Sequence, residues 1–235
     1  MSNTPTPLPP PEAAPLTPVE KFLTLFVPLF LLITLAGIIT CIQHLNSLFD
    51  WIVFIIALPV AWAMSDVITG ITHWALDTYG SEETPYLGYV LIKPFRMHHE
   101  HPTYMVQFDD APTIANSAAG ATPLQLIAWY VATLGGWWSI IALLFMIAFF
   151  GAVATNLFHK WSHMDTPPAF AKALQRCHLI LTVEHHDLHH ISPHKTAYCI
   201  TNGWMNPLLD TIHFWRAMEF VLGKLGLHPH EQKKV

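Results

Sequence analysis

Charged residues are scarce in this sequence. Asp, Glu, Lys and Arg together make up 11 % of its 235 residues, whereas a typical soluble domain carries about 25 %. Hydrophobic residues make up 52 %, and the formal net charge is −5. So few charges cannot form the basic surface that a nucleic-acid partner requires, and the balance predicts an integral membrane protein instead.

Cysteines are few, and two catalytic signatures are missing. No CxxC spacing joins the three cysteines, Cys41, Cys177 and Cys199, which predicts free thiols. A zinc protease requires HExxH, but the nearest stretch, "HEHPT" (99–103), ends in threonine where the motif has its second histidine. The GxSxG turn of serine hydrolases is absent as well. Neither enzyme class therefore has a basis in this sequence.

Long apolar runs predict membrane crossings. The run 22–43 has 22 residues without a charge, and a second run extends over 51–72 with Asp66 inside it. About 20 helical residues, at 1.5 Å each, cross a hydrocarbon layer of about 30 Å. Each run therefore predicts one transmembrane helix, in which Asp66 either has a buried partner or lies near the membrane surface.

A third apolar run, 111–158, has 48 residues without a charge, which is too long for one crossing. Gly135 and Gly136 offer a turn near its middle. Two crossings are therefore predicted, at about 114–134 and 137–158. We expect an all-α integral membrane protein with about four transmembrane helices.

The basic residues predict how this protein is oriented. Neither of the links 44–50 and 135–136 contains Lys or Arg, so all eleven lie in segments that share one side of a four-crossing arrangement. The positive-inside tendency makes that side cytoplasmic, with both termini on it. The seven prolines among residues 1–20 predict a disordered tail, followed by a membrane domain over 21–220 and a C-terminal tail over 221–235.

Sixteen histidines carry the chemistry of the sequence, and the stretch "HHDLHHISPHKT" (185–196) holds five of them. Two pairs spaced four residues apart, His73 with Asp77 and His159 with His163, fall at the cytoplasmic ends of two expected helices. This spacing places both members of a pair on one helix face. Loops bring further histidines to the same leaflet: His98, His99, His101, His185, His186, His189 and His190. The convergence predicts a metal centre in a cytoplasmic histidine-rich cap.

Eight or more converging imidazoles suit two metal ions. Imidazole binds zinc, copper, iron and nickel, so the ligand type alone does not select the metal. Asp77 is either a ligand or a partner that orients one. A pair of irons beside a membrane fits oxygen activation and removal of hydrogen from an unactivated C–H bond of a long apolar chain. Lys93, Arg96 and Lys160 are then placed to meet a lipid head group at the interface.

Four motifs carry a family resemblance. They are "THWALDTYG" (72–80), "KPFRMHHEHP" (93–102), "NLFHKWSHM" (156–164) and "HHDLHHISPHKTAYCITNGWMNPLLD" (185–210). Through these motifs, in order over about 66–219, the sequence resembles the plasmanylethanolamine desaturase family. This is the Kua or lipid desaturase domain group, which includes a plant chloroplast enzyme that desaturates phosphatidylglycerol acyl chains.

The resemblance implies an enzyme that introduces the vinyl ether double bond into 1-O-alkyl ether phospholipids, converting plasmanyl- to plasmenylethanolamine. It implies two Fe ions, O₂ and an external electron donor such as cytochrome b5 or ferredoxin. The implied metal ligands are His73, Asp77, His98, His99, His159, His163, His185, His186, His189 and His190. Additional ligands, or partners that orient a ligand, are expected among His101, His178 and His194.

Two positions depart from the family pattern, because His101 and Lys195 stand where the family has acidic residues. Both changes raise the local positive charge. Two other functions stay open. One is a desaturase or hydroxylase acting on the acyl chain of a phospholipid such as phosphatidylglycerol. The other is a non-catalytic membrane protein that binds metal.

Overall fold

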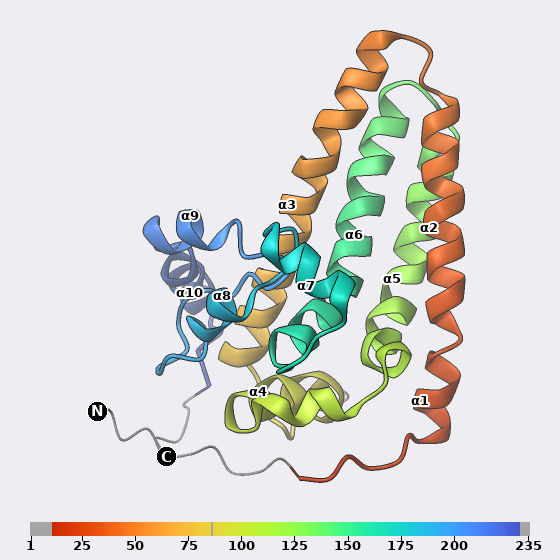
Figure 1. The fold of residues 1–235 in the computed structure, drawn as a ribbon. Helices are drawn as coiled ribbons and strands as arrows, with labels where there is room; N and C mark the ends of the chain where they lie inside the picture. The colour runs from red at the N-terminus through yellow and green to blue at the C-terminus, as the bar shows by residue number, and fades with distance from the viewer. Residues whose placement is uncertain (1–10, 86, 231–235) are drawn as a thin grey trace.

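Four long helices standing side by side form the body of the protein. The computed structural model describes residues 11–85 and 87–230, and in these residues it contains helices and no β-strand, as the sequence predicts. The long helices are α2 (Phe26–Gln43), α3 (Leu48–Thr78), α5 (Asp110–Ala132) and α6 (Trp137–Ser162). Helix α6 packs against the other three, as Figure 1 shows.

Short links join these helices at one end of the bundle. Ser47 and Asp50 form a capping box that starts α3 directly after the link from α2, and such a box satisfies two of the free amides of a helix start. Gly135 and Gly136 join α5 to α6 with φ values of 71° and 56°, a conformation that glycine adopts without strain. The predicted turn in the third apolar run is therefore confirmed.

Three helices in the described residues have the length and composition to cross a membrane. They are Pro18–Gln43, Leu48–Thr78 and Trp137–Ser162, the first of which joins α1 (Pro18–Leu23) to α2. These spans indicate a membrane protein, and large apolar side chains such as Leu32, Ile55 and Ile127 are exposed on the outside of the bundle. Hydrocarbon is the solvent that suits such a surface.

Helix α5 is the expected crossing that does not meet this criterion. Its 23 residues include small and polar ones, and Gln125 is fully buried. The Gln125 amide donates to Thr34 Oγ1 at 2.6 Å and to the Met146 carbonyl at 3.2 Å, which links α5 to α2 and α6. The helix is thus suited to the inside of the bundle, and a count of four crossings stays a prediction.

The remaining helices gather at the opposite end of the bundle from the short links, where α3 and α6 end (Figure 1). They are η1 (Gly88–Ile92), α4 (Lys93–Glu100), η2 (Pro102–Gln107), α7 (Ala169–Arg176), α8 (Val183–Asp187), α9 (Asn206–Thr211) and α10 (Phe214–Lys224). We call this end the cap. The chain is therefore arranged as a bundle of long helices with short helices at one end.

Two helices extend past the expected limits of the membrane domain. Helix α1 begins at Pro18, inside the segment expected to be a tail, and α10 continues to Lys224, past the expected limit at 220. Residues 1–10 and 231–235 of the two expected tails lie outside the described residues. Asp66 has buried partners, the first of the two alternatives expected for it, since it is fully buried and accepts hydrogen bonds from four backbone amides.

Candidate metal centre

The ends of α3 and α6 deliver the two pairs that the sequence spacing predicts. His73 and Asp77 lie on one face of the last turns of α3, and both are buried. His159 is buried in the last turn of α6, and His163 caps that helix. Because α3 packs against α6, the two pairs lie close together, and the rings of His73 and His159 are 6.0 Å apart.

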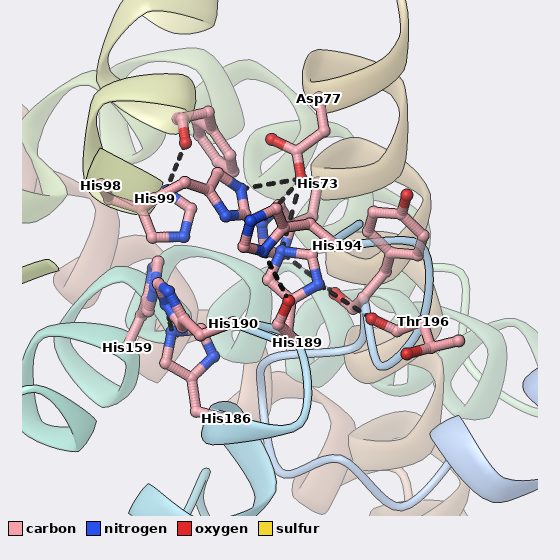
Figure 2. A network of polar contacts seen from close by, with 12 residues as sticks. His73, Asp77, His98, His99, His159, His186, His189, His190, His194 and Thr196 are labelled. Atoms are coloured by element: carbon pink, nitrogen blue, oxygen red, sulfur yellow. Dashed lines mark hydrogen bonds and ion pairs between the residues drawn. The ribbon is translucent and has the colours of Figure 1, made fainter. Parts of the chain in front are cut away.

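Cap elements close around these helix ends. Helix α4 supplies His98 and His99, and α8 with the turn that follows it supplies His186, His189 and His190. Thr182 begins α8 by accepting a hydrogen bond from the His185 amide, which satisfies one of the free amides of the helix start. Figure 2 shows the side chains of both elements pointing toward those of α3 and α6.

A first group of ligand atoms belongs to His73, His98, His99 and His189, and these atoms all lie within 4.8 Å of one another. Asp77 Oδ2 lies 3.3 Å from His73 Nε2, 3.2 Å from His99 Nε2 and 3.4 Å from His189 Nε2. The carboxylate therefore faces the same point as the three rings. It is placed either to bind an ion there or to balance its charge.

A second group belongs to His98, His159, His186 and His190, again within 4.8 Å. His163 joins it: its Nε2 lies 2.9 Å from His186 Nε2 and 3.3 Å from His159 Nε2, while His190 Nε2 lies 3.0 Å from His186 Nε2. Two imidazole nitrogens bound at right angles to one ion, each at about 2.1 Å, are about 3.0 Å apart. The spacing of these nitrogens therefore fits a shared ion.

Backbone carbonyls orient the rings of the first group. His73 Nδ1 contacts the Tyr198 carbonyl at 3.2 Å, His189 Nδ1 contacts the Thr196 carbonyl at 2.8 Å, and His98 Nδ1 contacts the Phe95 carbonyl. A carbonyl only accepts, so each Nδ1 carries the proton and each Nε2 has a free lone pair. The Nε2 atoms of these three histidines are buried without a hydrogen-bond partner. Buried lone pairs that converge in this way fit a cation.

Burial keeps four histidines of the second group neutral. Desolvation, with a smaller contribution from neighbouring histidines, holds the pKa of His98 and of His186 well below the ordinary value. The same cause lowers the pKa of His163 to about 4 and that of His190 to about 2. Neutral imidazole is the form that binds metal, so these side chains need not lose a proton at neutral pH.

The structure does not bring every expected ligand to this point. The ring of His185 packs on Gly203, where a Cβ atom would come within 2.9 Å of its Nδ1. His178 is exposed, and His101 lines a separate small pocket. His194 lies at the edge of the first group, with its ring 4.5 Å from that of His99 and its Nδ1 3.0 Å from the His189 carbonyl.

The three expected head-group residues have different surroundings. Lys93 and Arg96 line the small pocket of about 180 Å³ together with Glu82, Glu100 and His101. Lys160 is buried instead, with its ammonium 2.8 Å from Asp110 Oδ1 and donating to the Phe108 carbonyl at 2.5 Å. Its charge is therefore matched by Asp110, while Lys93 Nζ lies 3.9 Å from Glu82 Oε2 and Arg96 donates to the Tyr79 and Gly80 carbonyls.

An apolar groove of about 690 Å³ runs along the other side of α6. Its lining includes Phe158, Trp161 and Ala154 of α6, together with Trp62 of α3. At 100° per residue these α6 positions lie at least 100° around the helix from His159. The groove offers room for hydrocarbon, but it faces away from the histidines.

Sequence reasoning missed the carbonyls of Thr196 and Tyr198. They lie in the motif at 185–210, but a carbonyl leaves no signature in a sequence. The signal available in the sequence was Asp66, an acidic residue inside an apolar run, which needs buried partners. Those partners are backbone amides of the segment that follows Tyr198.

Fold and site together define a class, that of all-helical membrane proteins with two adjoining groups of histidines able to hold metal. The family model of the lipid desaturase domain matches residues 62–232, and the chain belongs to this family. No solved structure matches it.

Three relatives illustrate the match. A plasmanylethanolamine desaturase of Myxococcus xanthus is 40 % identical over 176 residues, covering 74 % of this chain and 63 % of that protein. Plasmanylethanolamine desaturase 1 of Mus musculus is 37 % identical over 177 residues, covering 71 % and 64 %. Fatty acid desaturase 4, chloroplastic, of Arabidopsis thaliana is 31 % identical over 175 residues, covering 72 % and 51 %. This chain spans slightly less than two thirds of the length of the first two relatives.

Proposed function

We propose that this protein is an O₂-dependent desaturase that introduces the vinyl ether double bond into 1-O-alkyl ether phospholipids. The observation that carries the proposal is the pair of histidine groups sharing His98 at one end of an apolar bundle. The names of the bacterial and mouse relatives supply the substrate class, a plasmanyl-ethanolamine lipid.

Nine side chains form the proposed ligand set for two iron ions. Asp77 belongs to the first group and His163 to the second, beside the histidines already described. The set is His73, Asp77, His98, His99, His159, His163, His186, His189 and His190. His194 lies close enough to the first group to act as a further ligand or to orient His99.

The reaction balances with one O₂ and two external electrons. The ether-linked alkyl chain loses one hydrogen from C1, the carbon bonded to the ether oxygen, and one from C2, and a double bond forms between C1 and C2. With two electrons and two protons from a donor and solvent, O₂ and the two hydrogens leave as two waters. O₂ is the oxidant, and bound iron would activate it. Cytochrome b5 or ferredoxin is the kind of donor we expect.

The side chains of this protein hold that chemistry in place. Carbonyls at Phe95, Thr196 and Tyr198 keep three imidazoles in the tautomer that presents Nε2. Burial of His73 and His189 keeps water away from the same point, and a dry site protects a reactive oxidant from side reactions. Lys93 and Arg96 are the proposed contacts of the phosphate head group.

For the membrane arrangement we propose four crossings, with α5 as the fourth beside the three apolar spans. The support is that α5 packs against α2 and α6 along the bundle. We further propose that the cap and both termini are cytoplasmic, because Lys and Arg are confined to the segments on that side. The segments 1–20 and 221–235 are proposed to flank the membrane domain as tails.

The test is expression in a host fed alkylglycerol, followed by lipid mass spectrometry. The expected product is an acid-labile vinyl ether, formed only by iron-loaded protein with O₂ and an electron donor. Iron-loaded protein that produces none would contradict the proposal. A new double bond in an ester-linked chain would favour an acyl desaturase, as the name of the Arabidopsis relative suggests. Exchangeable metal without O₂ consumption would favour a non-catalytic metal-binding protein.

A further inference from the structure

The segment 196–205, which we call the clamped segment, runs between α8 and α9 without regular secondary structure. It is nevertheless largely buried, including Tyr198, Cys199 and Ile200. A buried backbone must have its amides satisfied by some partner. Here side chains from three other positions provide those partners.

Asp66 provides most of them. Its Oδ1 accepts from the amides of Thr201 and Asn202 at 3.0 Å and of Gly203 at 3.1 Å, and its Oδ2 accepts from the Met205 amide at 3.0 Å. The carboxylate is fully buried in α3, two turns before His73. Four charge-assisted bonds from one buried carboxylate hold the backbone more rigidly than neutral ones.

Two more side chains extend the clamp toward the histidines. Asn206 Oδ1 accepts from the Cys199 amide at 2.8 Å, and Asn206 Nδ2 donates to the Cys199 carbonyl at 2.9 Å. Asp210 Oδ2 accepts from the Ala197 amide at 3.1 Å. The Thr196–Ala197 and Tyr198–Cys199 peptide units are therefore fixed in direction.

Fixed peptide units place the two carbonyls that orient the first group. Thr196 and Tyr198 present their carbonyls to Nδ1 of His189 and His73. The second group is held differently, since His163, His186 and His190 contact one another through Nε2, and these contacts do not involve the clamped segment. A disturbance of the segment should therefore affect one group and spare the other.

We propose that Asp66 is a positioning residue for the first metal position, acting through the clamped segment on His73 and His189. This inference rests on the proposed function only in requiring that the two groups bind metal. Partners that orient a ligating histidine contribute about 10- to 100-fold in metal affinity. Loss of the Asp66 clamp should therefore weaken one of two metal equivalents by at least about 10-fold.

The test is Co²⁺ titration of the purified full chain in nanodiscs, followed by visible absorption and a competing chelator. The variants are Asp66→Asn, which keeps the size but turns an N–H group toward the Met205 amide, and Asp50→Asn as the matched control. Asp50 caps the other end of the same helix. Wild type and Asp50→Asn are expected to bind two equivalents. Asp66→Asn is expected to bind one normally and one at least about 10-fold more weakly, with an altered spectrum.

Two results would overturn the inference. One is Asp66→Asn protein that binds both equivalents with wild-type affinity and spectrum. The other is an equal weakening of both equivalents, which would show a general loss of structure. If Asp66→Asn does not fold, Asn206→Asp decides, because it sets an oxygen against the Cys199 carbonyl with no change in size. Failure of both variants to fold would also refute a positioning role. Wild-type binding of fewer than two equivalents would refute the dinuclear centre itself, and the inference with it.

Discussion

His186→Ala, compared with His185→Ala, tests the ligand assignment at a single histidine doublet. The two residues are adjacent, yet His186 Nε2 lies 2.9 Å from His163 Nε2 and 3.0 Å from His190 Nε2, whereas the His185 ring packs on Gly203. His186 is 1 % exposed. Only the first substitution removes a nitrogen from the centre.

The size of the effect follows from the number of ligands. A four-ligand zinc site of a small domain contributes about 10–16 kcal/mol of binding free energy, so one ligand is worth roughly 3 kcal/mol. That free energy corresponds to a loss of affinity of roughly 100-fold. His186→Ala should therefore lose metal from the second group at concentrations that saturate wild type, and desaturation should fall with it.

The assay measures the metal content of the purified protein by mass spectrometry. Vinyl ether formation is measured on the same sample. His186→Ala should hold about half the metal of wild type and show little product. His185→Ala should keep the metal of wild type. Normal metal content in His186→Ala, or equal losses in both variants, would refute the assignment of these rings.

Three further outcomes are expected. Burial lowers the pKa of His163 to about 4, so between about pH 6.5 and 4 the unfolded chain binds a proton that the folded chain does not. Metal-free protein should therefore lose stability as the pH falls through this range. A melting temperature that does not change with pH would contradict this. Gly70→Ala puts a Cβ 2.5 Å from Cys199 Sγ and 3.3 Å from its Cα, and should cost about 1–3 kcal/mol in thermal unfolding and weaken the first metal equivalent. Leu143→Ala leaves a cavity at a fully buried position in the bundle. It should lower the free energy of unfolding by roughly 2 kcal/mol, less than in a soluble core, because the unfolded side chain is surrounded by lipid. The outward-facing Leu32→Ala should change the stability very little in the same thermal unfolding experiment.

The bundle and the cap histidines could be predicted because their signals are local. Uncharged runs are read directly from a sequence, and pairs such as His73 with Asp77 share a helix face wherever the helix lies. The limits of this reading show in α5, since Gln125 and its polar neighbours lower the apolar signal while their partners come from α2 and α6. Composition cannot register a partner that is distant in sequence.

The finer assignments of site residues also depend on partners that are distant in sequence. His185 and His186 cannot be told apart in the sequence, whereas in the folded chain His186 contacts His163 and His190 and His185 packs on Gly203. Lys160 is basic and follows an apolar run, as expected of a head-group contact. Its ammonium instead pairs with Asp110, which lies fifty residues earlier in the sequence. The clamped segment has no periodic pattern because side chains, rather than a helix or sheet, satisfy its amides.

His98 belongs to both histidine groups, and with Nδ1 directed at the Phe95 carbonyl it has a single lone pair to offer. One lone pair serves one ion at a time, so the two positions cannot be equivalent. Of two ions bound as proposed, the one without His98 would have one ligand fewer than its neighbour. A small molecule would then approach the centre from one side, and the two metal positions would differ in reactivity.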